Sequence, residues 1–360
     1  PSFAGGSSIA CLPRVGHVIL PPKSVRNVYR FFPMLPTANR RLLFVLLALL
    51  SAGSILAASA IGSVSLVWSE WLAALRSADS ANGELVWRLR LPRAAAAWTV
   101  GALLSLSGCL MQVLLRNPLA DPYILGVSGG ASFAALLGMT LGVSAAVLPG
   151  LAWAGALVSI VIVFSLARGE GPWSGTRLLL TGVVTASGWA ALISLLLTLG
   201  PDGSLRGMLF WLIGDLSYAT LPAWSFFLLL AIFLVCLGMA RSLNVLAMGE
   251  TTARLLGEPT RKLLWVVYLL ASVLTATAVS IAGNIGFVGL IVPHLMRLLV
   301  GSDHRILFPA AAMFGGLFLV LSDTLARTML APRQLPVGVV TALLGVPLFL
   351  LLLNRARVRQ

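Results

Sequence analysis

The chain has 360 residues, of which 59% are hydrophobic and only 10% are charged. Soluble globular domains are about 25% charged, so this composition excludes an ordinary soluble protein and indicates an all-α polytopic membrane protein. The net charge of +14 does not indicate nucleic-acid binding, because the Lys and Arg residues are scattered between apolar runs rather than gathered on one face.

The N-terminal stretch, residues 1–39, contains Gly, Ser, Pro and isolated basic residues without a sustained apolar period. We expect it to be a poorly ordered cytoplasmic extension. A cleaved signal peptide is the competing interpretation, but no apolar region of suitable length with a small-residue cleavage site precedes Arg40. Arg40 and Arg41 are followed by a long apolar run, which predicts a cytoplasmic anchor and a first span at the start of a transmembrane domain over residues 40–355.

Apolar runs long enough to cross a bilayer continue to the end of this domain. About 20 apolar residues cross roughly 30 Å of hydrocarbon, and by this rule the sequence predicts about ten transmembrane helices. They are expected near residues 42–63, 94–115, 123–142, 146–167, 178–199, 222–240, 263–283, 286–300, 307–329 and 336–353. Because an even number of crossings returns the chain to the side on which it began, we expect both termini in the cytoplasm.

Glycine and proline occur inside many of the predicted spans, for example Gly283, Gly286 and Pro293. Small residues let helices approach closely, and breaks are tolerated where neighbouring protein satisfies the backbone. The sequence therefore predicts a tightly packed bundle with interrupted helices, as transporters often have.

Arginines on or near the outer side of this topology run against the usual excess of basic residues inside. They are Arg76, Arg88, Arg90, Arg93, Arg206, Arg327 and Arg333. An outward basic rim suits an acidic partner or an anionic ligand, because complementary charge steers encounter and sets orientation. The alternative is that individual arginines only extend to lipid headgroups.

The sequence RNPLADP breaks the apolar pattern where two predicted spans meet. Pro118 and Pro122 exclude a continuous helix at this point. One interpretation is a rigid turn in which Asn117 and Asp121 cap the next helix. The other is a constriction on a transport path, since polar groups at membrane depth are tolerated when they line a cavity.

A charged, glycine-punctuated stretch, LAMGETTARLLG at residues 246–257, separates two predicted spans. Charged side chains such as Glu250 and Arg254 cost at least about 2.5–3.5 kcal/mol each in hydrocarbon, so the stretch must lie at a membrane face. Flanking basic residues place it on the cytoplasmic side. Gly249 and Gly257 favour a short, protruding helical unit to which a soluble partner could bind. The alternative is an ordinary cytoplasmic loop.

Residues typical of catalytic or metal sites are scarce. The three Cys and three His residues show no metal-binding spacing, and no GxxxxGKS or GxxxxGKT sequence is present to bind ATP phosphates. An intramembrane enzyme would need His294 or Asp323, but we expect His294 to pack or cap and Asp323 to pair with Arg327 one turn later. A proton-coupled secondary transporter is the other rival, and the scarcity of carboxylates in the spans argues against it. We expect no catalytic residue and no metal site.

Several of these stretches occur in the order typical of one family. They are RLPR at 90–93, RNPLADPYILGVSGGA at 116–131, RLLLTGV at 177–183, MLFWLIGDLS at 208–217, LAMGETTARLLG at 246–257, GFVGLIVPHLMRLLVGSDHR at 286–305 and LSDTLARTMLAPRQLPVGVVTALLGVPLFL at 321–350. Over about residues 42–353 the chain resembles the FecCD-type permeases, the membrane subunits of type II ABC importers for cobalamin, haem and ferric siderophores.

The resemblance implies a homodimer of ten-helix subunits in the bacterial inner membrane. Two cytoplasmic ATPase subunits would bind ATP and Mg, and a periplasmic binding protein would deliver the ligand, while this chain would bind no cofactor itself. It would move a metal chelate into the cytoplasm by alternating access. The motifs DPYILGVSGGA and WLIGDLS favour haem or cobalamin over ferric siderophores.

Matching positions in the family motifs also imply which residues act. The coupling region, residues 243–258, would dock in the ATPase through Gly249, Glu250, Ala253, Arg254 and Gly257. Arginines at positions that pair with acidic residues of the binding protein are Arg90, Arg93 and Arg327. Positions that match gates on the translocation path are Asn117, Leu119, Gly175 and Thr176.

Overall fold

The computed structural model describes residues 37–167, 175–217, 219 and 222–357. Within these ranges every regular element is a helix. The expected N-terminal extension lies outside the described residues up to residue 36, and residues 37–39 already belong to the first described helix.

Seven helices in the described part of the chain are long and apolar enough to cross a membrane. They are α2 (Thr37–Ala60), α5 (Leu91–Leu114), α7 (Leu148–Ala167), α8 (Gly175–Leu199), α10 (Ala223–Ala247), α12 (Thr260–Ala282) and α14 (His304–Thr328). Three shorter apolar helices are α6 (Val127–Thr140), α13 (Val288–Val300) and α15 (Val337–Arg357). Each of these helices corresponds to one predicted span, which confirms the all-α polytopic fold.

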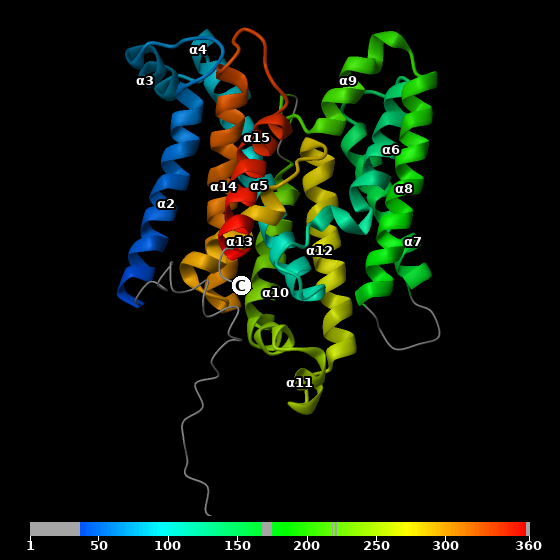
Figure 1. Cartoon of the computed structure of the whole chain (residues 1–360). Coiled ribbons are helices and arrows are strands. Elements are labelled where there is room, and N and C mark those ends of the chain that lie inside the picture. The colour runs from blue at the N-terminus through cyan, green and yellow to red at the C-terminus, as the bar shows by residue number, and fades with distance from the viewer. Residues whose placement is uncertain (1–36, 168–174, 218, 220–221, 358–360) are drawn as a thin grey trace, which may run out of the picture.

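Short helices lie at the two ends of the bundle (Figure 1). The end that we call the α9 end carries α3 (Trp68–Arg76), α4 (Ala81–Glu84) and α9 (Asp202–Ile213), and the opposite, α11 end carries α11 (Glu250–Leu255). A π-helical turn, η1 (Leu85–Arg90), joins α4 directly to α5. The sequence did not predict α9, because its 12 residues are too few to span a bilayer.

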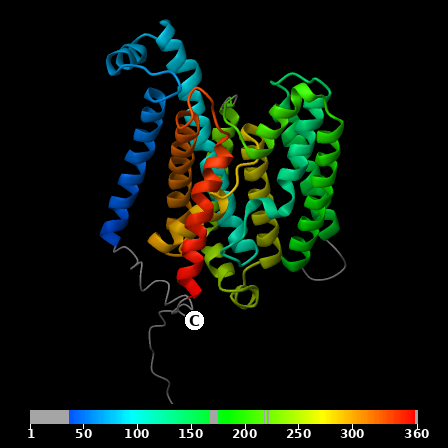
Figure 2. The same ribbon diagram turned by 45° about the horizontal axis from the view of Figure 1, so that its top comes forward.

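Burial separates central from peripheral helices. In the helix that ends in α5, 89% of the most apolar window is buried, against 72% in α12 and 67% in α14. The corresponding share is 28% or less in α2, α7, α8 and α10. In both ribbon views α2 lies at one edge of the bundle and α7 and α8 lie at the opposite edge (Figures 1 and 2). Their sides are therefore available to lipid, while α5, α12 and α14 form the core.

The contact between α5 and α14 depends on glycine. An ideal Cβ added at Gly101 would lie 2.2 Å from the carbonyl oxygen of Gly315, and one added at Gly315 would lie 1.8 Å from Ser105 Oγ. Such distances exclude any side chain, so the two backbones pack directly against each other. This confirms the close packing predicted from the glycines in the spans.

Two segments that interrupt the α-helices meet inside the bundle, where a side chain of one satisfies backbone groups of the other. One contains the 3-10 helix η2 (Pro122–Leu125), which precedes α6, and the other is residues 283–287, which precede α13. The Tyr123 hydroxyl donates to the carbonyl oxygen of Ile285 at 3.0 Å and accepts from the Ile285 N–H at 3.2 Å. Unpaired backbone groups cost several kcal/mol in an apolar environment, so the two breaks stabilise each other. These breaks also make α6 and α13 shorter than the predicted spans.

We predict that Tyr123→Phe destabilises the bundle, because it leaves both the N–H and the carbonyl of Ile285 without their partner. The expected loss is about 1–3 kcal/mol for each group left unpaired. Thermal unfolding of the purified chain in detergent, followed by tryptophan fluorescence, measures the change in Tm.

Tyr268→Phe is the matched control. The Tyr268 hydroxyl is also buried, but it bonds to the Ile160 carbonyl, which lies inside α7 and retains its helical hydrogen bond. We therefore expect a smaller fall in Tm for Tyr268→Phe. Equal falls would show that the Tyr123 hydroxyl has no special role in closing the two breaks.

Candidate functional site

The stretch predicted as a coupling region forms a short helix that projects at one end of the bundle (Figure 1). α11 contains only six residues, and it lies between Gly249 at φ +122° and Gly257 at φ +82°. Both angles lie in the region that side chains rarely adopt. The two glycines therefore set the sharp turns at which the chain enters and leaves this unit.

Side chains fasten α11 to the bundle behind it. Ala253 is fully buried. Arg254 forms an ion pair with Glu250 one turn earlier, and its Nε donates to Thr260 Oγ1 at 3.2 Å, at the start of α12. Buried Ala253 and the bond from Arg254 to Thr260 thus hold α11 against the bundle, while its other side is exposed to solvent.

We call α11 and its flanking residues, 246–257, the coupling unit, after the role predicted for it. It exposes large apolar side chains. Leu255 is 84% exposed, Leu256 is 63% exposed and Met248 is 47% exposed. The sequence did not single out these residues, because Leu and Met are equally common in the neighbouring spans. Large apolar side chains gathered on a protruding element are typical of a surface that another protein covers.

Three of the four candidate gate residues meet the coupling unit in one cavity. A cavity of about 360 Å³ is lined by Asn117, by Gly175 and Thr176 at the start of α8, and by Glu250 of α11. The fourth residue, Leu119, does not line it. Segments far apart in the sequence thus form one space next to α11.

The RNPLADP turn is rigid, as one of its two interpretations predicts. Asn117 Oδ1 accepts from the Leu119 N–H at 2.9 Å, and Asp121 Oδ1 caps η2 by accepting from the Tyr123 N–H at 2.8 Å. Arg116 has φ +48°, a strained value for a residue with a side chain. Asn117 both caps this turn and lines the cavity. Whether the cavity is a constriction on a transport path stays a prediction.

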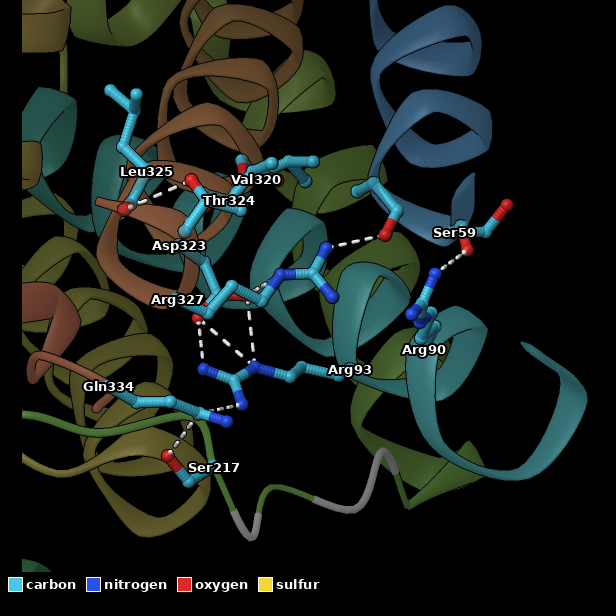
Figure 3. A network of polar contacts seen from close by, with 12 residues as sticks. Ser59, Arg90, Arg93, Ser217, Val320, Asp323, Thr324, Leu325, Arg327 and Gln334 are labelled. Atoms are coloured by element: carbon cyan, nitrogen blue, oxygen red, sulfur yellow. Dashed lines mark hydrogen bonds and ion pairs between the residues drawn. The ribbon is translucent and has the colours of Figure 1, made fainter. Parts of the chain in front are cut away.

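At the opposite end, the predicted docking arginines form part of a buried polar network (Figure 3). Arg93 binds both carboxylate oxygens of Asp323, with the shortest distance, 2.7 Å, from Nη2 to Oδ1. Its Nη1 donates to Gln334 Oε1 at 2.9 Å. Arg327 approaches Asp323 at only 3.7 Å. The expected i,i+4 pair therefore exists, but the main partner of Asp323 is Arg93, from another helix.

The guanidinium groups point inward rather than forming an open rim. Arg90 is 4% exposed and donates to the carbonyl oxygens of Ser59, Ala60 and Val64. Arg327 is also 4% exposed and donates to a carbonyl at the end of α2. The arginines of the predicted outer set that are exposed are Arg76, Arg88, Arg206 and Arg333.

The buried network contains more positive than negative charge. Arg93 and Arg327 share one buried carboxylate, Asp323, while buried Arg90 donates only to the backbone carbonyl oxygens already named. Arg327 Nε has no hydrogen-bond partner. A further anionic group would therefore be attracted to this end of the bundle.

Side chains that could bind a metal ion or act in catalysis are scarce in the described ranges. No group of three or more His, Cys, Asp or Glu residues there could hold a metal ion. Cys109 and Cys236 are buried and unpaired, as expected for packing residues, and the third cysteine lies outside the described residues. His294 packs in α13 with Nδ1 buried and unbonded.

Comparison with known proteins identifies the family. The FecCD transport family matches residues 45–355. The uncharacterised ABC transporter permease YvrB of Bacillus subtilis is 43% identical over 292 residues, which cover 78% of this chain and 81% of that protein. The vitamin B12 import system permease BtuC of Citrobacter koseri is 41% identical over 289 residues, which cover 77% of this chain and 85% of that protein.

The fold agrees with these matches. A solved structure of a metal-chelate type ABC transporter in an inward-facing conformation superposes with a TM-score of 0.77 and 32% sequence identity. The superposition covers 88% of this chain and 99% of that chain. The chain therefore belongs to the FecCD transport family and is a multi-pass, non-catalytic permease subunit of a bacterial ABC importer, whose ATPase is a separate subunit.

Proposed function

We propose that this permease moves a bulky metal chelate, haem or cobalamin in preference to a ferric siderophore, from the periplasm to the cytoplasm by alternating access. The observation that carries the proposal is the shared cavity at the α11 end. Its walls include Asn117 and Thr176, from the predicted gates, and Glu250 of the coupling unit. A partner that displaces α11 therefore changes the walls of the cavity directly.

Similarity to named transporters supports the substrate class. The relatives at about 40% identity include vitamin B12 import permeases, and the similar solved structure is of a metal-chelate type transporter. A permease of this kind needs no covalent chemistry, because selectivity can reside in the protein that delivers the ligand. Haem and cobalamin share a large, nearly planar metal-binding macrocycle.

The proposed assembly is a homodimer in the inner membrane with both termini in the cytoplasm. Two ATPase subunits, which bind ATP and Mg, would cover the α11 end. The exposed Leu255, Leu256 and Met248 supply the apolar surface for that contact, and buried Ala253 holds the unit against the bundle. Closure of the ATPase pair around ATP would thus push on a helix that cannot slide independently.

A periplasmic binding protein would dock at the α9 end. Complementary charge favours an acidic docking face, because exposed Arg76 of α3 and Arg88 of η1 belong to the same end of the bundle as buried Arg90, Arg93 and Arg327 (Figure 1). In this proposal an acidic side chain of the binding protein draws guanidinium groups away from Asp323. Asp323 then holds Arg93 and Arg327 inward only until the binding protein docks.

Uptake by proteoliposomes tests the function. The permease is reconstituted with its ATPase and binding protein, and labelled cobalamin, haem and a ferric hydroxamate are supplied outside. We expect ATP-dependent accumulation of cobalamin or haem. Accumulation of the hydroxamate alone would contradict the substrate class, and the absence of ATP-dependent uptake of every chelate would contradict the importer.

We predict that Glu250→Arg uncouples ATP hydrolysis from transport. The substitution replaces the ion pair with Arg254 by repulsion between two cations on adjacent turns of α11. Transport per ATP hydrolysed, measured in the same proteoliposomes, should fall at least about tenfold. The Tm should change little, because the pair lies at the protein surface.

Glu250→Gln is the control for the Glu250→Arg substitution, because it removes the charge without adding a repulsive one. We expect an intermediate loss of coupling. Wild-type transport per ATP in Glu250→Arg would rule out a coupling role for this side chain.

We predict opposite effects on docking for Arg93→Ala and Asp323→Asn, although both remove the same buried pair. Arg93→Ala should weaken binding of the binding protein about tenfold or more, since it removes a charge that the partner needs. Asp323→Asn should leave the Kd unchanged or lower it, because the arginines are released.

Both variants should lower the Tm. Arg93→Ala leaves buried Asp323 with only the 3.7 Å contact to Arg327, and Asp323→Asn removes the only negative charge that Arg93 and Arg327 share. The Kd of the binding protein for each variant is measured with the permease immobilised in nanodiscs, at two salt concentrations. These values separate an effect on docking from a general loss of stability. If Asp323→Asn weakened binding as much as Arg93→Ala does, the arginines would stabilise the bundle and would have no direct role in docking.

A further inference from the structure

A cluster of polar side chains joins the end of α10 to the start of α14, close to the coupling unit. Asn244 Nδ2 donates to Asp303 Oδ1 at 2.8 Å. Asn244 Oδ1 accepts from the backbone N–H of His304 at 3.0 Å and lies 2.5 Å from His304 Nδ1. We call these three residues the α10–α14 clasp.

The clasp has one chemically consistent arrangement. An amide oxygen only accepts hydrogen bonds, so the His304 nitrogen that faces Asn244, Nδ1, must carry the proton. Asp303 also caps α14, because its Oδ1 accepts from the Arg305 N–H at 3.1 Å. Burial raises the pKa of Asp303, but the hydrogen bonds from Asn244 and Arg305 and the nearby positive charges outweigh burial and lower it. The carboxylate therefore stays ionised at neutral pH and keeps a charge-assisted bond to Asn244.

Asn244 lies where the coupling unit is connected to the bundle. It is in the last turn of α10, and α11 follows within six residues. On the same turn, Ser242 Oγ donates to Glu258 Oε1 at 3.1 Å, which ties α10 to the far side of the coupling unit. The end of α10 is therefore joined to both ends of that unit and, through Asn244, to α14.

α14 connects the two ends of the bundle. It begins at the clasp, runs for 25 residues along the core, and carries Asp323 and Arg327 near its other end. Near its middle, at Gly315, it packs closely against Gly101 of α5. Pro309 removes one backbone hydrogen bond in its second turn, but the helix is unbroken from His304 to Thr328. A displacement that enters at His304 thus reaches the buried arginine network along one helix.

We propose that Asn244 is a positioning residue that makes α14 move with the coupling unit, so that a push on α11 changes the Arg93–Asp323–Arg327 network at the opposite end. This inference rests on the proposed ATP-driven function and adds the route between its two partner surfaces. The competing view is that the clasp only caps α14. Under that view, loss of Asn244 lowers stability but does not alter coupling.

The first test needs neither the ATPase nor a substrate. Spin labels at Leu255→Cys in α11 and Arg305→Cys at the start of α14 are placed in a Cys11→Ser background, where Cys109 and Cys236 are buried and unreactive. The distance distribution between the labels is measured in nanodiscs by pulsed electron resonance. We expect a narrow distribution that at least doubles in width in Asn244→Ala.

Asp303→Asn is the matched control, because an amide oxygen still caps α14 and still accepts from Asn244. It should keep the narrow distribution. An unchanged distribution in Asn244→Ala would overturn the proposal.

The second test measures transported chelate per ATP hydrolysed with the complete importer in proteoliposomes. Asn244→Ala should lower this ratio about tenfold, and Asp303→Asn should retain it. A lower Tm with the wild-type ratio would overturn the proposal in favour of simple capping. If the wild-type importer itself showed no ATP-driven uptake, the proposed function would fail, whereas the distance measurement would still decide whether Asn244 joins α14 to the coupling unit.

Discussion

The structure depends on satisfying backbone polar groups where helices are broken inside an apolar bundle. The breaks before α6 and α13 expose N–H and carbonyl groups that neither water nor lipid can pair. Tyr123 satisfies both backbone groups of Ile285 with one hydroxyl, which holds the two breaks together across the core. This crossing also fixes the RNPLADP turn, because Tyr123 follows directly from the Asp121 cap.

A rigid turn at that place has a functional consequence. Asn117 belongs to the same turn and lines the cavity that Glu250 also lines. The wall of the cavity on one side is therefore fixed to the core, while the wall on the other side belongs to the coupling unit. In the alternating access that we propose, a displacement of α11 and of the bundle behind it therefore changes this cavity on the side of Glu250.

Two polar clusters lie at opposite ends of α14 and differ in their charge balance. In the clasp, the side chains of Asn244, Asp303 and His304 all take part in hydrogen bonds within the chain, although His304 Nε2 has no partner. The network around Asp323 retains surplus positive charge and an unbonded Arg327 Nε. A cluster with nearly complete pairing is suited to transmit force, and a cluster with excess charge is suited to receive an anionic partner. α14 therefore extends between the two surfaces at which we propose that the ATPase and the binding protein dock.

The sequence by itself determined the features that depend on local composition. Apolar length placed the spans, and glycine with charge marked residues 246–257 as a unit at a membrane face, because hydrophobicity and backbone freedom are properties of neighbouring residues. Topology likewise placed Arg90, Arg93 and Arg327 at the end opposite α11, as the helices show.

Only the tertiary structure decided where those side chains point and what they bind. The main partner of Asp323 is Arg93, 230 positions away, rather than Arg327 on the next turn. No pattern within one span encodes such a pairing, since it arises when α5 and α14 pack at their glycines. The short helix α9, the apolar face of α11 and the clasp at Asn244 escaped prediction for the same reason: their roles come from neighbours in space and not from neighbours in the chain.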